Sequence, residues 1–361
     1  MSRLISQRGP WLRMLVSTLL CMTLVSCSAL SQTGESESAP QPNKPKTELE
    51  SLNPPKEPSI PAFTAPLTGL PADHAVVERP LAIMINNAPA ARPQAGLSQA
   101  DMVYEVLAEG GITRLIAFFQ SYGGKVKIGP VRSIRPYLIE LGETYGALPV
   151  HAGGSTDAYA ILQQQHKEHL DEISNAGAYF WRSKDRRPPH NLYTDVSRLR
   201  EGIDRKGYIM QTEVPVYRYL KSGETPVMAD ESAASLQIRF LLKNYRVSYT
   251  YDPANKQYKR FVNGKPHLDQ NNNQQLSAAN VIVMSATHRT LDDAGRLSVE
   301  LNGSGEAMVF QQGQLIHAGW QHTSGDVVRF MKNGVEISLT PGTSYIHVVP
   351  ADTPLQEHVT T

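Results

Sequence analysis

Residues 102–120 read MVYEVLAEGGITRLIAFFQ, two runs rich in β-branched and aromatic side chains on either side of two glycines. The pattern predicts a β-hairpin with a two-residue turn. Such a turn sets Leu107 opposite Arg114. Because side chains alternate along a strand, this register puts Glu105, Glu109 and Arg114 on one face of the hairpin.

The two acids and the arginine allow two interpretations. They form a general acid/base pair with an orienting cation, or they form an ion cluster on a solvated face or at the rim of a sheet. The opposite face carries apolar residues typical of a core, among them Met102, Tyr104, Val106 and Phe119.

Two further arginines lie in KIGPVRSIRP, residues 127–136. Arg132 and Arg135 are three residues apart, so a helical turn there projects both toward a similar side. Pro136 is typical of a helix start, where free backbone N–H groups and the helix dipole attract anions. The pattern therefore predicts a carboxylate or phosphate site. The alternative is that both arginines pair with internal acids, including Glu105 or Glu109.

Two more polar clusters follow. In VHAGGS, residues 150–155, His151 ends a predicted strand and Ser155 begins a helix, where α/β sheets place ligands; the alternative role of Ser155 is that of an N-cap. In FWRSKDRRPPHNLY, residues 180–193, Trp181, Arg182 and His190 accompany other basic residues. An aromatic ring beside arginines suits an anionic glycan or peptide, and the alternative is a solvated basic loop.

Metal and cofactor chemistry receives little support. His166 and His169 stand three apart, but not in an H-E-x-x-H arrangement. His267 and Asp269 share a face after a predicted hairpin, and a metal would still need another ligand. We therefore predict no metal and no cofactor. The formal net charge of +1 gives no sign of nucleic-acid binding.

The pattern of predicted strands and helices divides the chain into two domains. Residues 63–222 mix strands with helices expected at Pro136–Gly146, Ser155–Gln165 and Thr194–Lys206, with Ser155 and Thr194 as N-caps, which predicts an α+β or α/β N-terminal domain with a mixed sheet. Residues 235–353 consist of short runs from LQIRFLLK (236–243) to TSYIHVVP (343–350), which predicts a smaller all-β C-terminal domain. Residues 223–234 are the expected linker, and residues 354–361 the expected tail.

The N-terminus predicts export. Three arginines precede an apolar run that is too short to span a bilayer and that stops at LVSC, residues 24–27. The stretch resembles the lipobox of bacterial lipoproteins, in which the signal is cut before a cysteine that carries a diacylglycerol; the alternative is a plain secretory signal. We expect residues 1–26 to be a lipoprotein signal peptide and Cys27 to be lipidated.

Residues 27–62, rich in Ser, Pro, Glu and Lys, are expected to form a disordered tether. Loss of residues 1–26 removes three arginines and no acids, so the net charge falls from +1 to about −2. It also removes Cys21, and lipid occupies Cys27, so no disulfide is expected.

These motifs together resemble the YerB-type bacterial lipoproteins. The resemblance rests on PLTGLP (66–71), RPLAIMINN (79–87), the hairpin, IGPVRSIRPY (128–137), VHAGGS, FWR with PHNLY, and RFVNGKPHLD (260–269) with NVIV (280–283). It implies an N-terminal α/β-type domain followed by a smaller β-rich domain, and it implies no reaction. Asn86 and Asn87 stand where we expect an acidic or histidine-containing variant in relatives, so they receive no role.

The sequence therefore predicts an extracytoplasmic protein that is anchored by lipid to the cell membrane. In its first domain, one cleft is expected to be lined by Glu105, Glu109, Arg114, Arg132, Arg135, His151, Ser155, Trp181, Arg182 and His190. Two classes of function stay open. The cleft binds an anionic wall peptide, glycan or polymer, or an envelope protein; or a Glu and His151 or His190 transfer protons in a hydrolase or transferase.

Overall fold

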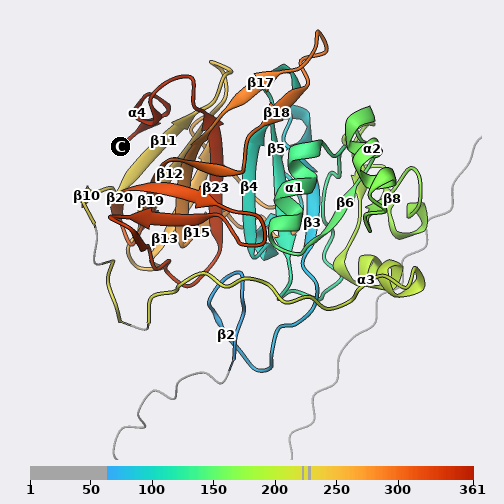
Figure 1. Cartoon of the computed structure of the whole chain (residues 1–361), viewed down its shortest axis with the longest axis horizontal. Helices are drawn as coiled ribbons and strands as arrows, with labels where there is room; N and C mark the ends of the chain where they lie inside the picture. The colour runs from blue at the N-terminus through green and yellow to red at the C-terminus, as the bar shows by residue number, and fades with distance from the viewer. Residues whose placement is uncertain (1–62, 222, 227–228) are drawn as a thin grey trace, which may run out of the picture. The chain divides into compact units, whose positions relative to one another are not determined.

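The structure, a computed structural model, describes residues 63–221, 223–226 and 229–361 (Figure 1). The expected signal peptide, Cys27 and the whole of the expected tether lie outside these residues. None of the described helices is long and apolar enough to cross a membrane.

A twelve-stranded mixed sheet forms the centre of the described part. Its order is β22 (Val335–Glu336), β21 (Arg329–Lys332), β20 (Gln314–His322), β19 (Gly303–Gln311), β16 (Asn280–Ala286), β23 (Ser344–Pro350), β4 (Met102–Leu107), β5 (Thr113–Phe119), β3 (Leu81–Asn86), β6 (Leu148–His151) and β7 (Leu170–Asp171), with β10 (Glu231–Ser232) beside β20. The pairs β16–β23, β23–β4, β3–β6 and β6–β7 are parallel, and the others are antiparallel. The predicted mixed sheet is therefore confirmed.

A six-stranded antiparallel sheet forms a second layer. Its order is β14 (Lys265–Pro266), β13 (Gln257–Val262), β12 (Arg246–Asp252), β11 (Ser235–Arg239) and β24 (Val359–Thr360), with β15 (Ser277–Ala278) beside β13. The two-stranded ribbons are β1 (Phe63–Thr64) with β2 (Pro71–Ala72), β8 (Trp181–Arg182) with β9 (Leu192–Tyr193), and β17 (His288–Thr290) with β18 (Leu297–Val299).

Four α-helices and four short 3-10 helices complete the described part. The α-helices are α1 (Pro136–Thr144), α2 (Thr156–Gln164), α3 (Val196–Arg205) and α4 (Leu355–His358), and the 3-10 helices are Pro89–Ala91, Leu97–Gln99, Glu109–Gly111 and Gly177–Tyr179. The three longer helices confirm the predicted ones to within two residues at each end. Ser155 caps α2 by accepting a hydrogen bond from the Ala158 N–H at 3.3 Å. The cap predicted at Thr194 is wrong, because Asp195 caps α3.

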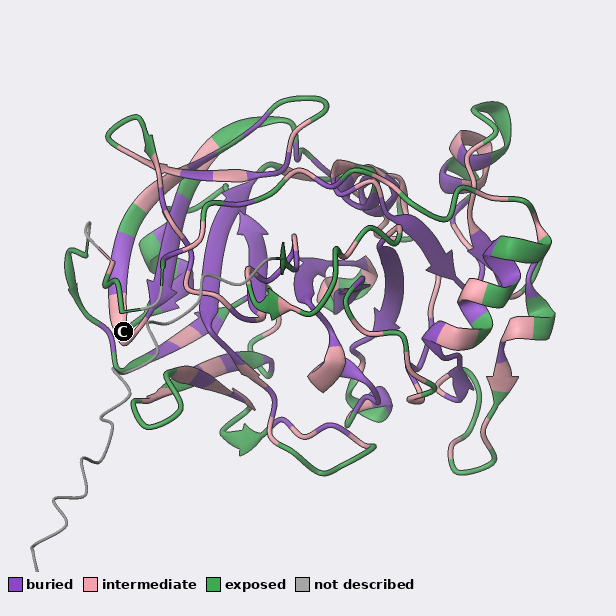
Figure 2. Cartoon of the chain, turned by 90° about the horizontal axis from the view of Figure 1, so that it is seen from below, coloured by how far each residue is buried: buried purple, intermediate pink, exposed green. Residues whose placement is uncertain are grey.

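The central strands are buried on both faces (Figure 2). On one face, Val103 and Leu115 pack in a core with Ile238 and Val247 of the six-stranded sheet. On the other face, Tyr104, Ile116 and Phe118 pack in a second core with Leu138 and Leu141 of α1. Alternation along β4 and β5 thus supplies two cores, which explains why their sequences read as nearly continuous apolar runs.

The β4–β5 hairpin differs from the predicted one by one residue of register. Leu107 pairs with Thr113 and Val106 pairs with Arg114, because the turn is longer and contains the 3-10 helix Glu109–Gly111. A shift of one residue moves side chains to the opposite face. Glu105 therefore faces the six-stranded sheet and Arg114 faces the other side, so their predicted shared face is wrong.

The two sequence segments share one sheet. β4 of the first segment pairs in parallel with β23 of the second, so part of the second segment extends the sheet of the first, while its other strands form the six-stranded sheet. The physical reason is that β4 is buried and needs a hydrogen-bonding neighbour on each edge. In the expected linker, β10 pairs with β20. The expected tail forms α4 and β24, and β24 pairs with β11.

A buried ion pair joins the two sheets. Glu105 on β4 and Arg260 on β13 are both fully buried, and the Arg260 Nη2 lies 2.7 Å from the Glu105 Oε2. The same carboxylate accepts hydrogen bonds from Asn87, Thr113 and Tyr245. Burial alone would raise the pKa of Glu105, but Arg260 and the surrounding hydrogen-bond donors outweigh it and hold the pKa well below its usual range. The carboxylate is therefore ionised inside the protein.

Each guanidinium nitrogen of Arg260 donates a hydrogen bond. Its Nη1 donates to the Tyr249 hydroxyl at 2.5 Å, and its Nε donates to His267 at 3.0 Å. His347, which pairs with Glu105 across β23–β4, places its Nδ1 3.2 Å from the carboxylate. The network thus connects β4 and β23 of one sheet to β12 and β13 of the other.

Replacing Arg260→Met is expected to lower the free energy of unfolding by about 3–5 kcal/mol, because it leaves a buried carboxylate without its cation. Glu105→Gln should also be strongly destabilising, and the double variant should lose less than the sum of the two single losses. Urea unfolding followed by circular dichroism measures all three values.

The matched control is Arg205→Met, which breaks an exposed pair with Glu201 on α3 and should cost at most about 0.5 kcal/mol. A loss at Arg260 no larger than the loss at Arg205 would show that the buried pair does not hold the sheets together.

Candidate functional site

Three arginines gather at the end of β3 and the start of α1. Arg114 on β5 pairs with Asn86, the last residue of β3. Arg132 lies in the extended segment that precedes α1, and its backbone N–H donates to the Met84 carbonyl at 2.8 Å. Arg135 is the N-cap residue of α1 and has an extended backbone. We call Arg114, Arg132 and Arg135 the arginine cluster.

The predicted helical spacing of Arg132 and Arg135 is wrong. α1 begins at Pro136, and a proline forces the residue before it into an extended conformation. The two side chains are therefore brought together by an extended segment rather than by a helical turn. That segment is held in place by a bridge from Val131 to Ile85 and another from Ile134 to Gly154.

One carboxylate accompanies the cluster. Glu109, in the 3-10 helix between β4 and β5, forms an ion pair with Arg135. Arg114 donates from Nη1 to the Ser133 carbonyl at 2.9 Å, and the Arg132 Nε is buried without a hydrogen-bond partner among the described residues. Of the two earlier alternatives, pairing with an internal acid holds for Arg135. The described residues thus set three guanidiniums beside one carboxylate.

The charges of the cluster affect one another. Burial, together with the charges of Arg135 and Arg132, lowers the pKa of Arg114 to about 10. Burial and Arg135 also lower the pKa of Arg132. Although burial raises the pKa of Glu109, hydrogen bonding to Arg135 and the positive charges nearby outweigh it, so this pKa lies below its usual value. Positive charge is therefore in excess here.

His190 lies beside the arginine cluster. Its Nδ1 lies 2.8 Å from the Asn86 Nδ2, and burial together with Arg132 and Arg186 lowers its pKa. In the neutral ring, Nδ1 accepts the amide hydrogen and Nε2 carries a proton. The ring can therefore donate one hydrogen bond without adding charge.

His151 is fully buried among other partners, so it is not open to a ligand as the predicted cleft requires. Its Nδ1 lies 2.9 Å from the Gly153 carbonyl oxygen and 3.6 Å from Asp171, and its ring stacks on His169. The Nε2 is buried and has no partner among the described residues. Burial lowers the pKa of His151 to about 4 despite the charge of Asp171. Ser155 serves as the cap of α2.

Trp181 and Arg182 lie on the β8–β9 ribbon and have other partners. Arg182 forms an ion pair with Glu172 at 3.0 Å. The guanidinium carbon of Arg198 lies 5.1 Å from the centre of the Trp181 ring. Glu105 belongs to the buried network between the sheets, where its carboxylate is inaccessible to a ligand.

Several residues that matter here were missed in the sequence. Asn86 and Asn87 received no role, yet Asn86 contacts His190 and Asn87 donates to Glu105. Arg260 was missed because it is distant in sequence from its partner. A signal for it was present: it occupies an inward position of a strand beside Tyr258, where a charged residue requires a buried partner. The described residues contain no set of three or more metal-binding side chains.

His151 predicts a pH dependence of stability. Its folded pKa of about 4 is below the ordinary value of 6.5, so the unfolded chain binds a proton that the folded chain rejects. Stability is therefore present above pH 6.5 and is lost as the pH falls toward 4, by about 3 kcal/mol for this group. Urea unfolding above pH 6.5 and near pH 4 should show that His151→Asn lacks this part of the pH dependence of stability.

His166→Asn, at an exposed position, is the matched control and should keep the wild-type dependence. Equal pH dependence in the wild type and in His151→Asn would mean that His151 is not held neutral by the fold.

The comparisons with known proteins agree with the sequence motifs. Residues 67–209 match the family described as "Protein of unknown function (DUF3048) N-terminal domain", and residues 236–346 match its C-terminal domain. Over 289 residues the chain is 35% identical to the Bacillus subtilis (strain 168) protein named "Putative lipoprotein YerB", a match that covers 79% of this chain and 86% of that protein.

A solved structure is also similar. The crystal structure of the YerB protein from Bacillus subtilis matches with a TM-score of 0.75 and 30% sequence identity, and covers 82% of this chain and 99% of that chain. The resemblance to the YerB-type lipoproteins is thus confirmed. The chain belongs to the DUF3048 family, the YerB-like proteins of unknown function.

Proposed function

We propose that the protein is a lipid-anchored lipoprotein that binds an anionic group of the cell envelope at the arginine cluster. The observation that carries the proposal is the excess of positive charge at a partly buried place: Arg114, Arg132 and Arg135 beside Glu109. A buried charge without a partner is costly, so a bound carboxylate or phosphate stabilises this arrangement.

The donors suit an oxyanion. Arg114 is 8% exposed and uses one hydrogen bond to hold the Ser133 carbonyl. The Arg132 Nε has no hydrogen-bond partner within the described part of the chain, and the neutral His190 ring adds an N–H donor. Guanidiniums form paired hydrogen bonds with carboxylates and phosphates, which lysines cannot do. A wall peptide, an acidic glycan or a phosphate polymer carries such groups.

Binding is favoured over acid/base catalysis by the state of the candidate acids and bases. Glu109 is ion-paired and its pKa is lowered, so it is a weak base at neutral pH. His151 and Glu105 are both fully buried. The hydrolase or transferase alternative would need these groups at one reacting atom.

Inorganic phosphate is the first probe. In Tris buffer, phosphate should raise the melting temperature of the full chain, and added sodium chloride should reduce this effect. Arg132→Gln should weaken phosphate binding about tenfold, because it removes a charged donor. Glu109→Gln should strengthen binding severalfold, because it removes the competing carboxylate.

Arg218→Gln changes an exposed arginine elsewhere and is the matched control. Equal phosphate affinity in the wild type and Arg132→Gln would refute the site. Loss of binding in Glu109→Gln would also contradict it. Soluble wall peptides and a glycerol phosphate polymer then separate carboxylate ligands from phosphate ligands.

The anchor is tested separately through the two cysteines. The relative named as a lipoprotein supports lipid attachment, and Cys27 is the proposed acceptor. When expressed in a bacterium that processes lipoproteins, the wild-type chain and Cys21→Ala should fractionate with the membrane. Cys27→Ala should be recovered in the soluble fraction or remain uncleaved. Unchanged lipid labelling in Cys27→Ala would exclude Cys27 as the attachment point.

A further inference from the structure

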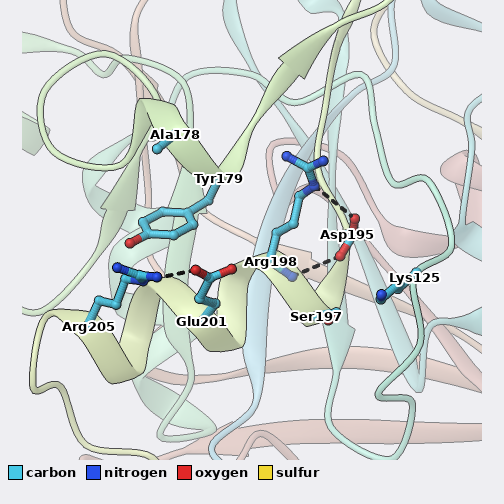
Figure 3. A pocket seen from close by; sticks show the side chains of 8 residues that line it. All are labelled: Lys125, Ala178, Tyr179, Asp195, Ser197, Arg198, Glu201 and Arg205. Atoms are coloured by element: carbon cyan, nitrogen blue, oxygen red, sulfur yellow. Dashed lines mark hydrogen bonds and ion pairs between the residues drawn. The ribbon is translucent and has the colours of Figure 1, made fainter.

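A cavity of about 520 Å³ opens beside α3 and shares no residue with the arginine cluster (Figure 3). Figure 3 shows Tyr179, Glu201 and Arg205 toward one end and Asp195, Arg198 and Lys125 toward the other. The cavity combines an aromatic ring with charged groups of both signs. It is therefore suited to a polar ligand that also has an apolar face.

Tyr179 supplies the aromatic surface. Its ring lies against Gly202 of α3, where a Cβ atom would approach the ring carbon Cδ2 to 2.8 Å. A side chain at position 202 would push the ring away from the helix. The glycine thus lets the ring lie close to α3 and line the cavity. An aromatic ring attracts C–H groups through its negative face.

Arg198 is held in place for a ligand. The Asp195 carboxylate accepts from the Arg198 backbone N–H at 2.8 Å and lies 3.4 Å from its Nε, while the guanidinium lies over the Trp181 ring. Both Nη groups lack a hydrogen-bond acceptor among the described residues. Asp195 is already used in capping α3 and in orienting Arg198.

Two other cations line the same cavity. Lys125 comes from the loop that follows β5. Arg205 pairs with Glu201 at 2.9 Å, but both side chains are more than half exposed, at 68% and 53%. An exposed pair of this kind is worth at most about 1 kcal/mol, so a ligand can replace it. The lining therefore carries three cations and two carboxylates, an excess of one positive charge, and the exposed Glu201–Arg205 pair is free to exchange partners.

We propose that this cavity binds a sugar residue that carries a carboxylate or a phosphate. The C–H face of the sugar ring stacks on Tyr179, its hydroxyls contact Glu201, and its anionic group contacts Arg198 and Lys125. This site is independent of the arginine cluster and of its proposed ligand.

The experiment uses Trp181 as a local reporter. The full chain has three tryptophans, of which Trp320 is buried and Trp11 lies outside the described residues. The chain is labelled with 5-fluorotryptophan, and Trp181→Phe assigns the ¹⁹F signal of Trp181. Glucuronate and glucose 6-phosphate are titrated separately, and the two arms distinguish a carboxylate from a phosphate ligand. Glucose, acetate and inorganic phosphate are the comparison compounds.

At least one acidic sugar should shift the Trp181 signal saturably, with an affinity at least about tenfold higher than that of glucose or of the simple anion. Arg198→Gln should weaken this binding about tenfold and Tyr179→Ala by a similar factor, whereas Tyr179→Phe should retain it. The affinity for the acidic sugar should be unchanged in Arg182→Gln, which lies on the same ribbon as Trp181, and in Arg132→Gln of the arginine cluster.

The proposal is overturned by any of three results: no saturable shift with either acidic sugar, equal affinity for glucose or for the simple anion, or wild-type affinity in Arg198→Gln. Urea midpoints of each variant show that the folded protein is being compared. Normal phosphate binding at the arginine cluster alongside failure here would reject this cavity alone.

Discussion

The buried pair of Glu105 and Arg260 is the interaction on which the rest of the structure depends. An ionised carboxylate can remain in a strand that is buried on both faces only if a cation and several donors meet it there. The cation comes from the second sheet, so the strand and that sheet must fold against each other. β23 extends the same constraint, because it joins β4 and brings His347 to the network. The two family segments consequently share the twelve-stranded sheet.

The buried network of Glu105 and Arg260 differs from the proposed ligand sites in how its charges are balanced. Around Glu105, each guanidinium nitrogen of Arg260 has an acceptor within the protein, and both side chains are fully buried. In the arginine cluster, three guanidiniums accompany Glu109, and the Arg132 Nε is left without an acceptor among the described residues. A satisfied buried charge stabilises a fold, whereas an unbalanced one near the surface favours an external anion. The same residue type therefore has different roles in β13 and before α1.

Local patterns predicted the elements well and their contacts poorly. The helices, the cap at Ser155, the mixed sheet and most strands follow from periodicity and turn residues. The hairpin register failed because a glycine pair does not reveal the 3-10 helix that includes Glu109, and one residue of slip reverses every face. Arg132 and Arg135 were predicted to come together and do so, although through an extended segment. Arg260 pairs with Glu105, which lies far away in the sequence, and Arg198 was not singled out from the sequence. No local pattern identifies either residue.

Native-state hydrogen exchange tests most directly whether Glu105 and Arg260 make the two sheets one cooperative unit. The measured quantity is the opening free energy of amides in β4 and β5 compared with amides in β12 and β13. If the pair joins the sheets, the slowest amides of both groups open with the same free energy, equal to that of global unfolding, and Arg260→Met lowers both together. Opening of β12 and β13 at a clearly lower free energy, with β4 and β5 still protected, would contradict the central claim.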